Sequence, residues 1–416
     1  MSEERFRANQ LAMLLTASLI FTAFTLVLPF LPFFLVSLGM EDPSRVAVWT
    51  GILLTVSPLL AALLGPFWGR LADRYGLKIM AQRVLLTMTV TWALTAFVRN
   101  HYELLFLRVL LGLFSGFGTI SVALITQGCT QQRIGRVVGR LQSVQILSAA
   151  AGPFIGGLLA NWIGIRATFL VTGALCGAAF LLTGYLYRDE PARRVGGVSG
   201  RDEPETRLRF RDIISMPGFF PVLVLMFATA MVDRSFSAVL PILVDRLSSG
   251  GISPMTAAGL VMSAGWFTAA GSAWFLGRWA TTGSMRILIA AGLVLGSAFT
   301  LPMAFVNGWI QLLILRCGLG FAVGGIMTLA YTIGGGAISR SRSTSFAILG
   351  SASLLGGAVG PMVSGLLASR DLALPFILNA GLYVLLSVWT VAMIRVPHRQ
   401  KGGPSTPAPA RLLIRD

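Results

Sequence analysis

Charged residues are scarce in this chain of 416 residues: Asp, Glu, Lys and Arg together make up only 12%. A soluble domain carries about 25%. Cysteine and histidine are scarcer still, with three and two residues. The cysteines Cys129, Cys176 and Cys317 follow no metal-binding or disulfide spacing. These shortages exclude a soluble globular protein, a disulfide framework and a histidine metal site, and we expect no metal and no organic cofactor.

Acids are outnumbered by bases, 16 to 33, and the net charge is +17. Such a charge can indicate a nucleic-acid partner, but the positions of the bases argue against one. A chain that crosses a membrane in an even number of helical spans has both termini on one side. Of the basic residues, 24 fall in the segments between spans or at the termini on that side, and 5 fall in the segments on the other side. Cytoplasmic segments carry such an excess. We therefore expect both termini in the cytoplasm, anionic membrane lipid near the basic segments and no nucleic acid.

Apolar residues dominate instead, at 55%, with a mean hydropathy of +0.77. They recur in stretches of about 20 residues, the length that spans a bilayer as a helix. We expect an all-α polytopic membrane protein with 12 transmembrane helices at 9–37, 46–67, 79–98, 103–125, 136–161, 166–187, 218–245, 254–276, 286–306, 309–333, 343–368 and 374–396. The first stretch is too long for the core of a signal peptide and is expected to be a permanent helix.

The chain repeats itself with an offset of 208 residues. Residues 104–116 (LLFLRVLLGLFSG) match 312–324 (LLILRCGLGFAVG), and 152–160 (GPFIGGLLA) match 360–368 (GPMVSGLLA). Duplication of a six-span unit explains a shared offset, and it predicts two pseudo-symmetric helical bundles. The expected parts are an N-terminal bundle at 1–187, a cytoplasmic linker at 188–215, a C-terminal bundle at 216–396 and a cytoplasmic tail at 397–416.

The loop between the second and third spans reads GRLADRYGLK at 69–78. This pattern resembles the signature loop of the major facilitator superfamily. The resemblance implies a cytoplasmic gate, in which the acid binds nearby basic side chains and the positive end of the eleventh helix. The candidate gate residues are Gly69, Asp73, Arg74, Gly76 and Lys78. The alternative is a solvated connector, and the second copy of the loop has Thr281 where the acid would stand.

The fifth and eleventh spans each contain a proline among small residues. Proline bends a helix, and small residues allow a partner helix to approach the bend. The first copy resembles a motif of drug–proton antiporters within this superfamily. Its residues and their second-half counterparts are Gly152, Pro153, Gly156, Gly157, Gly360 and Pro361. The alternative is packing without a specific function.

The fourth span carries Arg108, and the tenth carries its counterpart Arg316. An arginine in lipid is costly unless it has a partner or faces water. Arg108 lies close enough to the start of its span to extend to the outer surface, which is one interpretation. The other comes from the resemblance, which implicates this arginine in proton movement.

Asp233 is the acid that lies deepest in any expected span, about 15 residues into the seventh. A carboxylate held in apolar surroundings takes up a proton more readily than one in water. Asp233 is therefore our candidate proton carrier, with Arg234 and Arg108 as candidate participants. Arg234 is adjacent, but consecutive helical residues do not face each other. The alternative is a static ion pair that joins the seventh span to a neighbour.

The resemblance also implies a central cavity lined by spans one, four, seven and ten. Candidate lining residues are Thr25, Thr119, Gln142, Gln145, Met226, Phe227 and Tyr331. A largely apolar wall with few polar groups suits hydrophobic substrates. Ordinary packing is the alternative role for these residues.

Taken over the whole chain, the sequence resembles bacterial drug:proton antiporters of the major facilitator superfamily, such as multidrug and tetracycline efflux carriers. The resemblance implies secondary active efflux of small molecules by alternating access, driven by the proton motive force, in the bacterial inner membrane and by a monomer. One alternative is a metabolite exporter for sugars, amino acids or siderophores, and another is a non-transporting membrane sensor. An enzyme is not expected, because the chain has neither a nucleophile–base set nor a phosphate-binding loop.

Overall fold

The computed structural model of the protein describes residues 3–129, 131–187, 219–248, 251–279, 285–337 and 342–394. The expected linker at 188–215 and tail at 397–416 lie outside the described residues, as does Thr281.

Within the described ranges the chain forms twelve helical rods and no strand, which confirms the predicted all-α fold. In chain order the helices are α1 (Glu3–Val27), η1 (Leu28–Phe30), α2 (Leu31–Ser37), α3 (Pro43–Tyr75), α4 (Leu77–Thr95), α5 (His101–Leu113), α6 (Phe117–Thr126), α7 (Gln131–Ile163), α8 (Ile165–Leu186), α10 (Phe219–Leu247), α11 (Pro254–Trp279), α12 (Met285–Thr300), η2 (Leu301–Phe305), α13 (Trp309–Val323), α14 (Ile326–Ala337), α15 (Arg342–Ala368) and α16 (Leu374–Met393). Ten segments are long and apolar enough to cross a membrane, and α4 and α11 complete the twelve rods.

Several rods are interrupted where the sequence predicted one continuous span. Pro29 lies in the 3₁₀ turn η1 between α1 and α2, because proline cannot donate the hydrogen bond that continues an α-helix. The fourth rod breaks between α5 and α6, where Gly116 adopts a φ of +127° that favours glycine. The tenth rod is interrupted at the equivalent place, because α13 ends at Val323 and α14 begins at Ile326, but there Gly324 keeps a helical φ of −57°.

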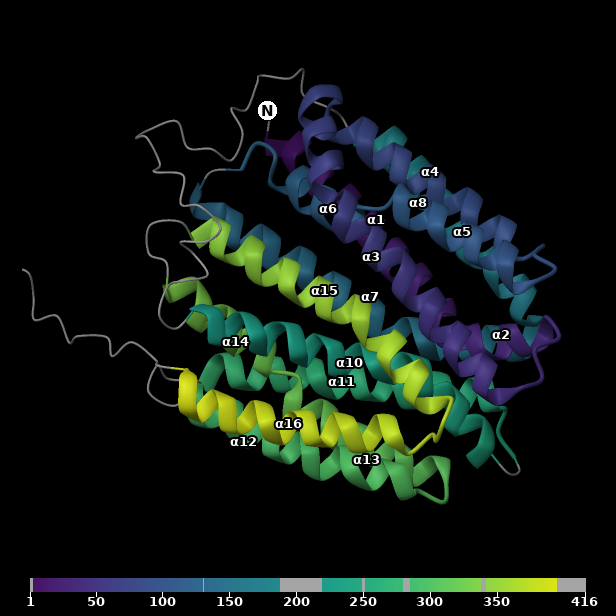
Figure 1. The fold of residues 1–416 in the computed structure, drawn as a ribbon. Coiled ribbons are helices and arrows are strands. Elements are labelled where there is room, and N and C mark those ends of the chain that lie inside the picture. Colours follow the sequence, from purple (N-terminus) through teal and green to yellow (C-terminus); the bar gives the residue numbers. More distant parts are fainter. Residues whose placement is uncertain are drawn as a thin grey trace, which may run out of the picture.

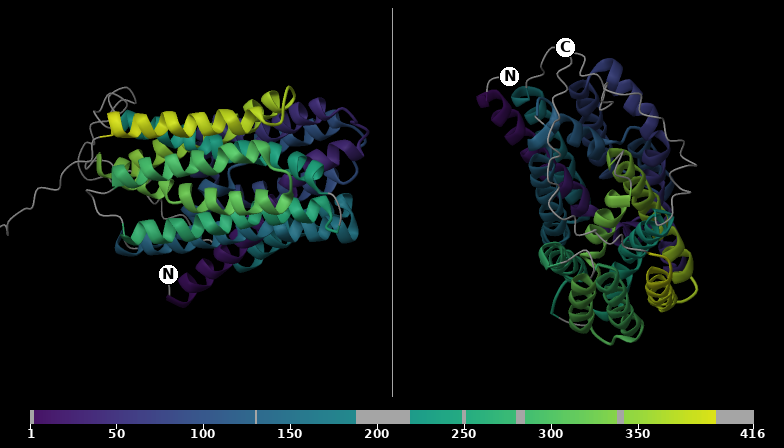
Figure 2. Two further views of the ribbon diagram at one scale, coloured as in Figure 1. Left: turned by 90° about the horizontal axis from the view of Figure 1, so that it is seen from below. Right: turned by 90° about the vertical axis from the view of Figure 1, so that its left-hand side faces the viewer.

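The rods lie alongside one another, with the helices of the first half grouped apart from those of the second (Figure 1). Helix α1 begins and α16 ends at the same end of the molecule, which we call the terminal end; the other is the distal end. Two further views show the same bundle of long rods (Figure 2). The two halves meet mainly where α3 packs on α15 and where α7 packs on α11.

Glycines bring these helices into backbone contact near the distal end. A Cβ added to Gly51 on α3 would lie 2.7 Å from the Pro361 oxygen, and one added to Gly259 on α11 would lie 2.2 Å from the Pro153 oxygen. These two contacts are related by the 208-residue repeat. By contrast, nothing lies within 4 Å of the corresponding Cβ positions toward the terminal end of α3, α7 and α11, at Gly65, Gly69, Gly135, Gly139 and Gly271. The halves are therefore pressed together distally and separate toward the terminal end.

Candidate functional site

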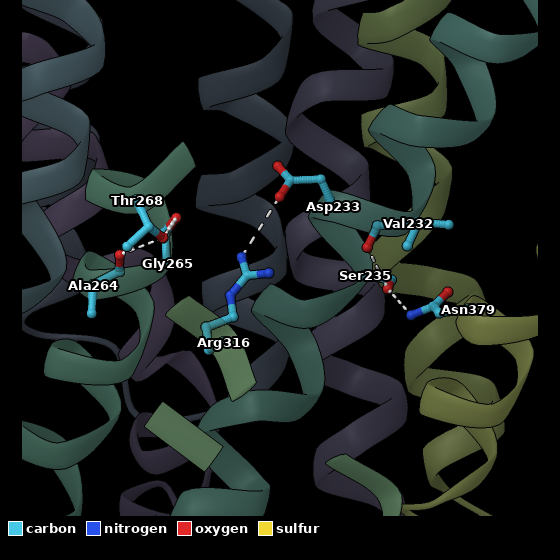
Figure 3. A network of polar contacts seen from close by, with 8 residues as sticks. All are labelled: Val232, Asp233, Ser235, Ala264, Gly265, Thr268, Arg316 and Asn379. Atoms are coloured by element: carbon cyan, nitrogen blue, oxygen red, sulfur yellow. Dashed lines mark hydrogen bonds and ion pairs between the residues drawn. The ribbon is translucent and has the colours of Figure 1, made fainter. Parts of the chain in front are cut away.

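An ion pair joins the middle of α10 to the middle of α13, the first helix of the tenth rod. Asp233 is the fifteenth of the 29 residues of α10, and Arg316 is the eighth of the 15 residues of α13. Arg316 Nη2 lies 3.6 Å from Asp233 Oδ1 (Figure 3). The arginine side chain is 4% exposed and the aspartate side chain 42% exposed. A buried cation is thus held against a carboxylate that remains accessible.

The surroundings of Arg316 fix the direction of its side chain. The guanidinium carbon lies 4.8 Å from the centroid of the Phe236 ring, a cation–π contact from the turn that follows Asp233. On the side away from the Phe236 ring, the Arg316 side chain packs against Gly265 of α11, where an added Cβ would lie 2.7 Å from Arg316 Nε. Arg316 Nε is buried and has no hydrogen-bond partner. The ion pair with Asp233 is therefore the main compensation for this buried charge.

A short polar chain continues from the same turn of α10 toward α16. Asn379 Nδ2 donates to Ser235 Oγ at 2.6 Å, and Ser235 Oγ donates to the Val232 oxygen at 2.8 Å (Figure 3). Asn379 and Ser235 are both 4% exposed. Buried polar groups that are fully paired hold a helix in one position, so α10 is tied to α16 beside the ion pair.

The pairing of Asp233 with Arg316 is an ion pair between spans, which the sequence left open as the alternative to a proton carrier. Arg234 is exposed, and its guanidinium carbon lies 5.8 Å from the Trp266 ring centroid. It does not face Asp233, because consecutive helical residues point in directions about 100° apart. The roles of Asp233 and Arg234 in proton movement stay predictions.

Arg108 occupies the equivalent place in the first half but has different neighbours. It is 3% exposed, so it does not extend to the surface of the membrane. Its guanidinium carbon lies 4.5 Å from the Trp92 ring centroid, and its Nη2 has no hydrogen-bond partner. No carboxylate of the described ranges pairs with it, in contrast to Arg316. Its role in proton movement stays a prediction.

The gate loop joins α3 to α4 at the terminal end. Gly76 makes the turn with a φ of +92°, and Asp73 and Arg74 are exposed. Asp73 pairs with no described side chain; the side chains of the first turns of α15, its expected partners, lie outside the described residues. Lys78 turns instead toward α8 and donates to the Tyr187 oxygen at 2.6 Å. Gly69 has no neighbour within 4 Å of its Cβ position.

The proline motifs form the contacts on both sides of α7 and α15. On α15, Cβ atoms added to Gly356 and Gly360 would lie 2.0 Å and 2.1 Å from the oxygens of Phe227 and Met231. The face of α15 that carries these two glycines therefore packs against α10. The opposite face of α15, with Pro361, reaches α3 of the other half. The equivalent helix α7 packs against α1 through Gly152 and Gly156 and contacts α11 through Pro153 and Gly157. Each motif therefore connects one helix of its own half, α1 or α10, to a helix of the opposite half.

The candidate cavity residues divide into two groups. Thr25 and Met226 are 4% and 0% exposed and lie in helix contacts, so in this conformation they line no cavity. Thr25 is held there by its own helix, because Thr25 Oγ1 donates to the Phe21 oxygen at 2.8 Å. The remaining candidates are exposed or half-buried: Thr119, Gln142, Gln145, Phe227 and Tyr331. Gln145 Nε2 lies 3.4 Å from Ser121 Oγ, which joins α7 to α6.

A small pocket of about 160 Å³ lies at the distal end, where α3 begins and α10 and α15 end. Its lining includes Ser44, Arg246 and Asp371. The pocket is too small for a drug-sized ligand, which needs roughly 300–1,000 Å³, and it is far from the midpoint of the rods. It marks the rim of the distal contact between the halves.

Sequence reasoning identified Asp233 and Arg316 separately but missed that they pair. It also missed Gly265, Ser235 and Asn379. One signal was present: the repeat places Gly265 where the first half has Ser57, and the missing side chain leaves room for Arg316.

Comparison with known proteins agrees with this architecture. Residues 13–306 and 251–415 match the profile of the Major Facilitator Superfamily. The multi-drug resistance efflux pump PmrA homolog of Lactococcus lactis is 32% identical over 384 residues, covering 91% of this chain and 93% of that protein. The multidrug resistance protein MdtG of Klebsiella pneumoniae is 30% identical, covering 92% of each.

Among solved structures, a bacterial homolog of the human lysosomal transporter Spinster, in an inward-facing and occupied conformation, superposes with a TM-score of 0.79 at 16% identity. That match covers 97% of this chain and 100% of the other. The human organic anion transporter MFSD10 gives a TM-score of 0.65 at 18% identity, with 92% and 99% covered. Matched along nearly its whole length by both sequence and fold, this chain belongs to the major facilitator superfamily.

Proposed function

We propose that this protein is a multidrug efflux transporter that exchanges protons for hydrophobic small molecules by alternating access. The observation that carries the proposal is the Asp233–Arg316 pair, in which an accessible carboxylate at the midpoint of α10 meets a buried cation of α13. The names of the relatives that match more than nine-tenths of the chain support the substrate class. The proposed setting is the bacterial inner membrane, with the terminal end in the cytoplasm because it carries most of the basic residues.

The coupling step begins at Asp233. Protonation neutralises the carboxylate and removes its attraction for Arg316, whose charge is then left without compensation in a buried site. The favourable response is a shift of α10 relative to α13 that gives Arg316 a new environment. Loss of the proton restores the ion pair and reverses the shift. The protein binds no cofactor in this scheme, and the proton gradient supplies the free energy.

Helix α15 can transmit this shift to the contact between the halves. One of its faces touches the α10 backbone at Phe227 and Met231, two turns and one turn before Ser235. Its other face touches α3 of the first half, where a Cβ added to Gly365 would lie 2.4 Å from the Ala47 oxygen. A movement of α10 at the ion pair therefore displaces α15 and strains its distal contact with α3. That contact must open for the substrate to be released to the outside.

The test uses purified protein in vesicles that contain a pH-sensitive dye, under an imposed proton gradient. We expect lipophilic drugs to trigger proton movement. Asp233→Asn should abolish transport against a drug gradient while drug still exchanges down its gradient, because only coupling needs the titrating group. Asp245→Asn, which alters an exposed acid of the same helix, is the matched control and should behave as wild type.

Uphill transport by Asp233→Asn at the wild-type rate would refute the coupling role of Asp233. Proton movement triggered only by sugars or amino acids would replace the drug-efflux proposal with a metabolite exporter. If no solute triggers proton movement in vesicles that contain the wild-type protein, a membrane sensor would be favoured.

A further inference from the structure

The break in the fourth rod leaves the last carbonyl groups of α5 without the hydrogen bonds of a continuous helix. In a membrane such groups need partners from elsewhere in the protein. Trp68 Nε1 donates to the Leu113 oxygen at 2.7 Å. Arg83 Nη2 lies 3.4 Å from the Phe114 oxygen and 3.5 Å from the Ser115 oxygen, and it donates to both. Two side chains from two other helices thus cap three successive carbonyl groups.

The two capping side chains also stack on each other. The Arg83 guanidinium carbon lies 3.3 Å from the Trp68 ring centroid, close contact for a cation over an aromatic face. Arg83 Nε and Nη1 are buried without a hydrogen-bond partner, as expected of nitrogens that lie against a ring. The Phe114 ring lies 5.8 Å from that of Trp68. A cation at the carboxyl end of a helix is also favoured by the helix dipole. We refer to Trp68 and Arg83 as the clamp.

The clamp lies between the gate loop and Arg108. Trp68 directly precedes Gly69, the first residue of the gate loop. A second hydrogen bond joins α5 to α3 on the distal side of the clamp, where Ser57 Oγ donates to the Arg108 oxygen at 2.6 Å. There an added Cβ on Gly112 would lie 2.9 Å from Ser57 Cα. Helix α3 therefore carries the gate loop at one end and holds the backbone of Arg108 in its middle.

The second half lacks the two clamp side chains. At the equivalent positions, 208 residues on, Leu276 replaces Trp68 and Ala291 replaces Arg83, so neither can donate a side-chain hydrogen bond. Leu276 packs against the equivalent stretch, where a Cβ added to Gly325 would lie 2.4 Å from its Cδ1. The tenth rod is also interrupted there, between Val323 and Ile326, but Gly324 keeps a helical φ. The clamp and the positive φ of Gly116 thus occur together in one half, and it is the half whose loop contains the acid.

We propose that Trp68 and Arg83 are positioning residues for transport, which hold α6 at its angle to α5 and transmit the state of the gate loop to Arg108. The proposal rests on the proposed function for its transport readout. It places the effect of the clamp on the conformational step, because neither side chain lies at the Asp233–Arg316 pair. Loss of the clamp should slow turnover and leave drug binding unchanged.

The first test compares Arg83→Met, Arg83→Lys and Trp68→Phe in the vesicle assay. Arg83→Met should lower the maximal rate about tenfold, the effect expected for loss of a charge-assisted hydrogen bond, with unchanged half-saturation and drug affinity. Arg83→Lys should recover most of the rate, since an ammonium can cap a carbonyl over the same ring. Trp68→Phe keeps the ring and removes the donor, so it should give an intermediate rate and carries the test if Arg83→Met does not fold.

Arg166→Met is the matched control. Arg166 Nη1 donates to the oxygens of Ala96 and Val98 at 2.9 and 3.1 Å, so it caps a helix end too, but at the distal end of α4 and away from the gate loop. It should transport as wild type. An equal loss in Arg166→Met, or a wild-type rate in Arg83→Met, would overturn the proposal.

A double-mutant cycle with Asp73→Asn tests the link to the gate loop. Residues that act through one element give non-additive effects, whereas independent sites add. We expect Asp73→Asn to have little further effect in the Arg83→Met background, and additive losses would overturn the link.

A second readout does not depend on drug transport. Cys129 follows α6 in the chain and is half-buried, whereas Cys176 of α8 is buried. In Arg83→Met a membrane-impermeant maleimide should label Cys129 faster and Cys176 at its wild-type rate. An unchanged labelling rate of Cys129 would overturn the proposal that the clamp holds α6. If instead the wild-type protein shows no drug-driven proton movement, only the proposed function is overturned.

Discussion

The glycine contacts between the halves predict the effect of adding a single methyl group. In Gly259→Ala the new Cβ would lie 2.2 Å from the Pro153 oxygen and 3.4 Å from Gly157 Cα. The first distance is far below ordinary contact, and its partner is backbone rather than a flexible side chain. The helices α7 and α11 must therefore separate by about 1 Å at the distal end, a cost of about 1–3 kcal/mol for overpacking.

That cost applies only to the conformation in which the distal ends touch. A differential of about 1–3 kcal/mol shifts a two-state equilibrium by about 5- to 150-fold. Gly259→Ala should therefore favour the conformation that is open distally and slow a transport cycle that requires both states. The other contacts rank the remaining variants by the distance of the added Cβ from a backbone oxygen: 2.4 Å at Gly365, 2.6 Å at Gly157 and 2.7 Å at Gly51.

The measurement is the distance distribution between spin labels at the distal ends of α7 and α11. Gly259→Ala should raise the fraction of long distances and lower the maximal transport rate. Gly271→Ala is the control on the same helix, because nothing lies within 4 Å of its Cβ position. If both variants give the wild-type distribution, the glycine contacts do not hold the distal end closed and the reasoning fails.

Three further predictions concern stability and the ion pair. Asp233→Asn should destabilise the purified protein by about 1–3 kcal/mol in thermal or denaturant melts because it leaves Arg316 buried and uncompensated; adding Arg316→Met should recover stability, and a double variant as unstable as the single one contradicts this. Gly265→Ala should displace the Arg316 side chain and reduce proton coupling, measured as protons moved per drug, without changing drug affinity. Ser263→Ala removes the acceptor of a 2.9 Å hydrogen bond from the Phe154 backbone nitrogen and should cost about 1 kcal/mol, whereas Thr55→Ala, at the equivalent position where the hydroxyl is buried and unpaired, should cost less; equal melting temperatures would count against this difference.

The positions of the rods were predictable from the sequence because each depends on a local property, the length of an apolar stretch. The break after α5 was not. Gly116 and Gly324 occupy equivalent positions in matching segments, yet only Gly116 leaves the helical conformation. In the first half Trp68 and Arg83 satisfy the freed carbonyl groups, whereas the equivalent residues Leu276 and Ala291 have no side-chain donor. A break of this kind depends on side chains about 30 to 45 residues away, which no local pattern contains.

The candidate site was predictable in part for a similar reason. An acid in the middle of an apolar span is conspicuous, so Asp233 could be identified without a structure. Its partner could not, because the nearest base in sequence, Arg234, points elsewhere, while Arg316 lies 83 residues away. The assignment required knowing that α10 and α13 are neighbours at that depth.

The two halves have kept their backbone contacts and diverged in their charges. The distal contacts at Gly51 and Gly259 obey the repeat, as do the proline motifs that flank them. Rocking of two bundles about a pseudo-twofold axis explains this, because both contacts must close together. The proposed mechanism needs only one proton-binding carboxylate, since the bundles move relative to each other and a change in one displaces both. On the proposed mechanism the second half therefore carries the coupling pair, the first half carries the clamp and the gate loop, and neither half suffices for transport alone.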